Sequence, residues 1–137
     1  GSLYKLIIDG TSTFITNEKD ISPGFAIRSL EKNLDNELWI GTENNGLYIY
    51  SNDLDFIRHI QYNVTRPNSL SGDSIWSLLC TRNGTMWIAP YRSGLNVYDK
   101  DFFKFQHVNS DPFNPKSLSN KLVNCFVEDG LEQMAAA

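Results

Sequence analysis

The residue types that chemistry requires are sparse in this sequence and poorly grouped. His59 and His107 are the two histidines, but no cluster of Cys, Asp or Glu accompanies them, as a metal site would require. A glycosidase needs two carboxylates, or a tyrosine nucleophile with an acid and an arginine, converging on one pocket. The sequence offers no such set. We therefore expect no catalytic residues, no metal site and no cofactor, and we expect both histidines to be solvated or packed at an edge.

The two cysteines, Cys80 and Cys125, are the next candidates for chemistry. In the internal repeat of the sequence, Cys125 aligns with Ser77, so the thiols lie three residues out of step, or roughly 10 Å along a strand. A disulfide requires Cα atoms within about 4.4–6.8 Å of each other. We therefore predict two buried free thiols.

The histidines and cysteines lie in segments that belong to an internal repeat of the sequence. Residues 25–72 align with residues 73–120 without a gap, and 14 of the 48 positions are identical. A period of about 40–50 residues is typical of an array of structural units. An earlier copy ends near Leu3–Leu6 and a later one starts at Lys121, so two units are complete and two are partial.

Each complete unit has the pattern of four short strands joined by tight turns. The strands are predicted at 26–32, 37–42, 46–51 and 56–62 in the first unit, and at 74–80, 85–90, 94–98 and 102–108 in the second. In the second unit the first strand is apolar on both faces and the last alternates, so we expect burial to decrease from the first strand to the fourth. Asn83-Gly84 predicts a primed hairpin turn.

A four-stranded antiparallel unit of this length cannot cover its own faces, so it must stack on copies of itself. The sequence therefore predicts an all-β fold, a β-propeller fragment of about three four-stranded antiparallel blades, two of them complete and two partial. Trp39, Trp87, Tyr50 and Tyr98 recur at a fixed register. We expect them to fill the space between blades rather than to form a platform for sugars.

Positions that differ between units, on a face that the units share, are free to serve a ligand. The second residue of the first strand and the loop after the second strand are such positions. They provide the candidate ligand-binding residues Arg28, Trp76, Asn124, Glu43, Tyr91 and Arg92. Arg, Trp, Tyr and Asn are residue types that stack on sugars or hydrogen-bond to them. The alternative is that these are variable surface residues without a ligand.

Three runs of the first complete unit, with their counterparts in the second, carry a family resemblance. They are Leu38-Trp39-Ile40-Gly41-Thr42, Gly46-Leu47-Tyr48-Ile49-Tyr50 and Pro67-Asn68-Ser69-Leu70-Ser71, matched by Met86-Trp87-Ile88, Gly94-Leu95-Asn96-Val97-Tyr98-Asp99 and Pro115-Lys116-Ser117-Leu118-Ser119. In this order they resemble the two-component regulator propeller repeat, and the resemblance covers about Leu3 to Gly130. The second complete unit departs from the family pattern at Ala89-Pro90, where the family has Gly-Thr.

The resemblance implies a function and a location. Such repeats build the periplasmic sensor region of hybrid two-component systems of Bacteroides-like bacteria, where propellers sense glycan fragments and a cytoplasmic histidine kinase relays the signal. We expect this chain to be a non-enzymatic, periplasmic part of such a sensor histidine kinase, whose parent is anchored in the inner membrane. A propeller scaffold for protein interaction, without a small ligand, and a propeller enzyme acting on glycosides are the alternatives. A flat, apolar face would favour the scaffold.

Composition and charge limit the classes of molecule that this chain is expected to bind. The chain has 12 Lys plus Arg against 16 Asp plus Glu, a net charge of −4, which argues against a nucleic-acid binder. No apolar run approaches the roughly 20 residues of a membrane span. We expect an oligo- or polysaccharide fragment and the remaining blades of the parent sensor as partners, with no nucleic acid and no membrane contact by this segment.

The repeat also predicts the domain boundaries. Residues 1–2 are interpreted as the remnant of a cleaved tag and 131–137 as a non-native tail. Between them the expected units are a partial blade with third and fourth strands at 3–24, complete blades at 25–72 and 73–120, and the start of the next blade at 121–130. Because the partial blades are complementary, we expect that two copies can associate head to tail into a homo-oligomer.

Overall fold

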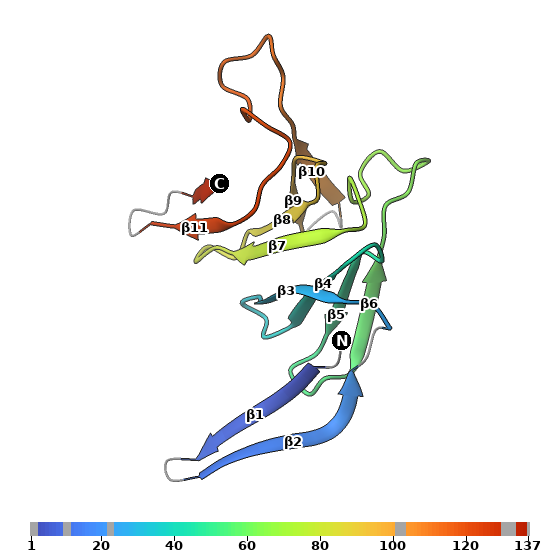
Figure 1. Ribbon diagram of the computed structural model, residues 1–137, viewed down its shortest axis with the longest axis vertical. Coiled ribbons are helices and arrows are strands. Elements are labelled where there is room, and N and C mark those ends of the chain that lie inside the picture. Colours follow the sequence, from blue (N-terminus) through green and yellow to red (C-terminus); the bar gives the residue numbers. More distant parts are fainter. Residues whose placement is uncertain (1–2, 10–11, 22–23, 101–103, 130–133, 137) are drawn as a thin grey trace.

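The computed structural model describes residues 3–9, 12–21, 24–100, 104–129 and 134–136 of the chain (Figure 1). Every regular element in these residues is a β-strand, which confirms the all-β prediction. The strands are β1 (Leu3–Asp9), β2 (Ser12–Ile21), β3 (Ile27–Lys32), β4 (Leu38–Thr42), β5 (Leu47–Tyr50), β6 (Phe56–Ile60), β7 (Ile75–Cys80), β8 (Met86–Pro90), β9 (Leu95–Asp99), β10 (Lys104–Val108), β11 (Phe126–Glu128) and β12 (Met134–Ala136). The described residues contain no helix long and apolar enough to cross a membrane.

Two four-stranded antiparallel sheets form the centre of the molecule. Blade one has the strand order β3-β4-β5-β6, and blade two has β7-β8-β9-β10. Each strand begins and ends close to its predicted bounds. The first strands of the two blades, β3 and β7, lie next to each other (Figure 1). The internal repeat of the sequence is therefore a repeat of one four-stranded blade.

Each partial unit forms a two-stranded antiparallel sheet. β1 pairs with β2 at the N-terminal end, where third and fourth strands were expected. At the C-terminal end β11 pairs with β12, so the segment interpreted as a tail, 131–137, supplies a second strand to the third unit. Its non-native origin stays a prediction.

Burial does not follow the predicted order along a blade. β4 is intermediate at its first residue and buried at the other four, and β8 is almost as buried, whereas exposed and half-buried residues alternate in β3. The expectation that the first strand is the most buried is therefore wrong. The first strand is the edge of its sheet, whereas the second strand has a neighbour on either side and its side chains pack into the core between blades.

The main hydrophobic core is shared by the two blades. Trp39 of β4 is 1% exposed, and its ring meets the ring of Tyr98 of β9 edge-on, with centroids 5.1 Å apart. The buried cluster around this pair draws on both sheets, with Trp39, Leu47 and Ile49 from blade one and Ile75, Leu78, Met86, Ile88 and Phe105 from blade two. This arrangement confirms the inter-blade role predicted for Trp39 and Tyr98.

The other two recurrent aromatic residues have different neighbours. Trp87 packs against a second cluster that contains Val123, so it too lies between units. Tyr50 contacts Phe56 of its own blade, with centroids 5.8 Å apart, and burial raises its pKa above 10.0, with a smaller contribution from Tyr48. Tyr50 occupies the same position of the repeat as Tyr98, but the ring contact found for it is with its own blade.

The turn at Asn83-Gly84 differs from the primed turn that was predicted. Gly84 has a φ of 88°, but Asn83 is not among the residues with positive φ, and a type I′ turn requires both. The Gly84 N–H donates to the Thr81 carbonyl at 2.8 Å, and the Thr81 N–H to the Thr85 carbonyl at 2.9 Å. This is a type I turn closed by a glycine bulge, and Asn36, with a φ of 63°, has the equivalent place in blade one.

A repeated backbone hydrogen bond ties each blade to the segment that enters the next. The Gly46 N–H donates to the Asp73 carbonyl at 2.7 Å, and the Gly94 N–H donates to the Lys121 carbonyl at 3.0 Å. The donors occupy equivalent positions of the repeat, and so do the acceptors. The loop after the second strand is therefore held against the linker that leads into the next first strand.

The departure at Ala89 is explained by its packing partner. In blade one, a Cβ added to Gly41 would meet Ser29 Oγ and lie 2.7 Å from Ile75 Cγ2. In blade two the larger Ala89 belongs to one buried cluster with Val123, which stands where the repeat has Ile75. Valine keeps Cβ and Cγ2, the atoms that meet the added group, but lacks the Cδ1 methyl of isoleucine, so the exchange frees volume beside the contact and nearly conserves the total.

We predict that Gly41→Ala destabilises the chain, whereas Gly41→Ala combined with Ile75→Val, which copies blade two, recovers part of the loss. The single change should lower the free energy of unfolding by about 1–3 kcal/mol, because it overfills the contact between blades. Urea unfolding of the four variants of this double-mutant cycle measures the coupling. Strictly additive effects would contradict the packing account.

The cysteines are free, but their burial differs. Cys80 is partly buried, whereas Cys125 is exposed, so the prediction of two buried thiols is wrong for Cys125. Cys125 lies immediately before β11 (Phe126–Glu128). Burial raises the pKa of the Cys80 thiol above 9.0, a hydrogen bond from the Leu34 backbone lowers it less, and Glu31, Glu128 and Asp35 add smaller increases.

We predict that iodoacetamide alkylates Cys125 before Cys80 at pH 8, since only thiolates react and Cys80 keeps its proton more tightly. Because the folded chain holds that proton more tightly than the unfolded chain, the Cys80 contribution to stability falls as the pH rises through and above 9. Mass spectrometry of timed samples, with Cys80→Ser as the control, follows the order. Faster alkylation of Cys80 would contradict this assignment.

Candidate ligand-binding face

Two β-bulges at equivalent positions present Arg28 and Trp76. The pairing of β3 with β4 skips a residue between Ile27 and Ser29, and the pairing of β7 with β8 skips one between Ile75 and Ser77. A bulge leaves its extra residue outside the regular ladder and changes the direction of a side chain. Arg28 and Trp76 are these extra residues, so the same backbone irregularity positions both.

The loops after the second strands begin beside these bulges. The Glu43 N–H donates to the Ala26 carbonyl at 2.8 Å, and the Tyr91 N–H donates to the Ser74 carbonyl at 2.7 Å. Each bond closes the end of a sheet just before its first strand starts. It thereby places Glu43 near Arg28 and Tyr91 near Trp76.

Five of the six candidate residues form one continuous array across both blades. Arg28 Nη2 lies 2.8 Å from Glu43 Oε2, and the Arg28 guanidinium carbon lies 6.0 Å from the centre of the Trp76 ring. The Trp76 ring stacks on Tyr91, with centroids 4.5 Å apart and planes at 21°. The Arg92 guanidinium carbon lies 5.2 Å from the centre of the Tyr91 ring. We call these five residues the inter-blade stack.

The inter-blade stack is open to solvent. Trp76 is 36% exposed and Tyr91 38%, and the side chains of Arg28 and Glu43 are 44% and 39% exposed. These groups are held by their neighbours and remain accessible to a ligand. Asn124, the sixth candidate, is exposed and is not part of the stack.

Arg92 has an unusual backbone conformation. Its φ is 53°, as is typical of the left-handed region, which costs a residue with a Cβ roughly 1–2 kcal/mol. Asn44 has the same position in blade one with a φ of 63°, but asparagine accepts this region readily. Backbone strain of this kind concentrates at functional sites, which supports Arg92 as a candidate.

A cavity beside Arg92 extends the face. It has a volume of about 520 Å³ and is lined by Arg92, Ser110, Ser119, Asn120, Lys121 and Leu122. Apart from Leu122, every lining side chain carries a hydrogen-bond donor. The sequence interpretation did not name the linker residues of this cavity, because their position beside Arg92 depends on the bond from Gly94 to the Lys121 carbonyl.

The histidines have separate, local partners. His59 Nε2 lies 2.8 Å from the Asn45 carbonyl oxygen, and its ring stacks on Tyr48 with centroids 4.1 Å apart. His107 Nε2 lies 2.8 Å from the Ser69 carbonyl oxygen. Both are exposed and hold a neighbouring loop in place. Within the described ranges, no three His, Cys, Asp or Glu side chains are grouped closely enough to hold a metal ion.

Comparison with protein families agrees with the resemblance seen in the sequence. Residues 69–92 match the family model described as two component regulator propeller. This part of the chain is a two-component regulator propeller repeat. The matched repeat runs from the linker through β7 and β8 to the loop with Tyr91 and Arg92. No curated protein matches the chain.

Solved structures with the same fold come from Bacteroides thetaiotaomicron. The extracellular domain of a proposed hybrid two-component system, BT3049, matches 99% of the chain with a TM-score of 0.64 and 18% identity. The extracellular domain of a second proposed system of this kind, BT4673, matches 100% with a TM-score of 0.54 and 17% identity. The chain spans 20% and 24% of those two domains. At such identities the likeness shows the fold, and the chain is a run of β-propeller blades.

We predict that Glu43→Gln lowers the free energy of unfolding by less than about 1 kcal/mol, because an ion pair this exposed is screened by water. Urea unfolding at low and at high salt measures the effect. The free energy of unfolding should depend less on salt in Glu43→Gln than in the unchanged chain. A loss of several kcal/mol would show that the pair with Arg28 is structural rather than available to a ligand.

Proposed function

We propose that the chain is part of the ligand-sensing propeller of a hybrid two-component sensor histidine kinase, and that its ligand is an oligosaccharide bound at the inter-blade stack. The two-component regulator propeller repeat and the fold shared with sensor extracellular domains support the sensor role. One observation supports the proposed binding site. Five residues that vary between the units come together from two blades in one half-exposed array.

The chemistry of the stack suits a sugar. An aromatic ring accepts the apolar face of a pyranose, while guanidinium and carboxylate groups bond its hydroxyls. The guanidinium groups of Arg28 and Arg92 lie over the aromatic rings. Cation–π contacts at exposed sites contribute only about 0.5–1 kcal/mol, so a sugar ring can take the place of either group. The displaced guanidinium then bonds the hydroxyls of the same sugar.

The mixed character of the face favours a sugar over a protein scaffold. A scaffold would present a flat, apolar surface, whereas this face combines two aromatic rings, two arginines, a carboxylate and the polar cavity beside Arg92. Hydrolysis is not part of the proposal. The stack contains a single carboxylate, Glu43, which Arg28 holds at 2.8 Å, and glycoside hydrolysis generally uses two carboxylates.

The proposed location is the periplasm. The two solved structures compared above are extracellular domains of proposed hybrid two-component systems. A ligand-sensing segment outside the cytoplasm, in a parent anchored in the inner membrane, fits an oligosaccharide that arises outside the cell. The relay to a kinase then lies in other parts of the parent.

We predict that Trp76→Ala and Arg92→Ala each weaken binding of the inducing oligosaccharide about tenfold or more, the effect of losing roughly 1.4 kcal/mol of contact energy. Titration calorimetry with a panel of oligosaccharides measures binding, and the transcriptional response of the intact parent measures signalling. His107→Ala is the matched control, because His107 lies on the outer strand β10 and contacts the Ser69 carbonyl of the linker. Equal losses in all three variants would contradict the proposed face.

A further inference from the structure

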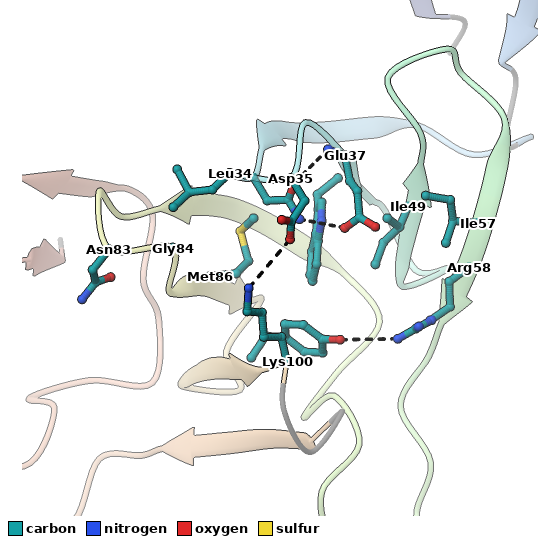
Figure 2. Close-up of a pocket in the computed structure, with 13 residues that line it drawn as sticks. Leu34, Asp35, Glu37, Ile49, Ile57, Arg58, Asn83, Gly84, Met86 and Lys100 are labelled. Atoms are coloured by element: carbon teal, nitrogen blue, oxygen red, sulfur yellow. Dashed lines mark hydrogen bonds and ion pairs between the residues drawn. The ribbon is translucent and has the colours of Figure 1, made fainter.

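A second cavity lies between the blades at the opposite end of the strands (Figure 2). It is lined by residues of the turns between first and second strands, 33–35 and 37 of blade one and 83–84 of blade two, whereas the inter-blade stack lies where the first strands begin. Its volume is about 350 Å³. Pockets for small molecules have volumes of about 300–1,000 Å³, so this cavity suits a small ligand.

The cavity combines an apolar floor with charged groups of both signs. Trp39, Ile49 and Met86 are buried side chains that line it. Figure 2 shows the carboxylates of Asp35 and Glu37 and the cationic groups of Arg58 and Lys100 around it, with Lys100 Nζ 4.0 Å from Asp35 Oδ2. A ligand here therefore meets both charges as well as apolar surface.

The side chain of Trp39 lines the cavity, and its polar atom is buried. Its indole nitrogen, Nε1, is buried and has no hydrogen-bond partner in the part of the chain that the structure describes. An indole N–H can only donate, and a buried tryptophan N–H is usually paired. Because Nε1 itself is buried, a ligand in the cavity contacts the Trp39 side chain rather than this N–H, and the indole resonance reports on that contact.

The charged groups at the cavity are held by neighbours. The Asn33 amide donates to Glu37 Oε2 at 2.7 Å, and the Glu37 backbone N–H donates to Asn33 Oδ1 at 2.8 Å. Arg58 Nη1 donates to the Tyr98 hydroxyl at 3.4 Å. The carboxylate of Glu37 and the guanidinium of Arg58 are thus oriented before any ligand binds, which lowers the entropy cost of binding.

These charges are not required by the blade repeat. In blade two, the positions of Asp35, Glu37 and Arg58 are occupied by the neutral residues Asn83, Thr85 and Gln106. Blade two forms the same four-stranded sheet without them. The charged set is therefore specific to the interface between blades one and two, as expected for a ligand site rather than for a packing feature.

We propose that this cavity binds a free amino acid with an apolar side chain, as its zwitterion. A simple anion would face the carboxylates, and a simple cation would face Arg58. A zwitterion satisfies both, because its ammonium group bonds Glu37 and its carboxylate bonds Arg58. The apolar side chain of the ligand then covers Ile49 and Met86.

The test is titration of the ¹⁵N-labelled chain with L-leucine, L-methionine and L-phenylalanine, followed by the indole N–H resonances of its three tryptophans. Trp39→Phe identifies the Trp39 signal. At least one amino acid should shift that signal and leave the Trp76 signal in place. L-leucinamide and N-acetyl-L-leucine, which lack one charge each, should bind at least about tenfold more weakly than L-leucine.

Two variants test the charges, with a matched control at the other end of the blades. Glu37→Gln and Arg58→Gln should each weaken binding about tenfold, whereas Asp111→Asn, in the exposed loop after β10, should leave it unchanged. Unchanged Trp87 resonances show that each variant is folded. A Trp39 signal that none of the three amino acids shifts, as expected of a cavity that holds only water, would overturn the proposal, and so would equal shifts with the two singly charged derivatives.

Discussion

Contact between neighbouring blades is the constraint on which the rest of this structure depends. A four-stranded sheet has two faces, and neither blade has a layer of its own to cover them. Trp39 is 1% exposed only because blade two supplies Tyr98 and Met86 to the same cluster. The contact is narrow at Gly41, where a single added methyl group would collide with Ile75. The exchange to Ala89 and Val123 in the next unit shows that the volume at this contact is maintained, even where its residues change.

Both ligand sites that we propose lie across this contact. The inter-blade stack joins Arg28 and Glu43 of blade one to Trp76, Tyr91 and Arg92 of blade two. The second cavity likewise has walls from both blades. A ligand at either site therefore touches two sheets whose spacing is set by one core. Binding energy at such a site favours one spacing of the blades, and this is the kind of differential contact through which a sensor transmits occupancy.

Positions shared by the units serve packing, whereas positions that differ serve the proposed sites. The recurring Gly46 and Gly94 donate the same hydrogen bond to the linker ahead, and the recurring Trp39 and Trp87 pack between units. Arg28 and Trp76 share a bulge but have different side chains. The backbone irregularity is thus part of the blade, and the side chain that it presents is the variable part.

The sequence by itself determined the strands, the four-stranded unit, the core between blades and five residues that meet in one array, because strand patterns are local and a repeat superimposes equivalent positions. It did not determine the stacking of Trp76 on Tyr91, the cavity at Trp39, the exposure of Cys125 or the greater burial of the second strand. Those features depend on how one blade is rotated and spaced against the next. That geometry results from side-chain volumes across the whole contact, which no local pattern encodes, so only the tertiary structure decided it.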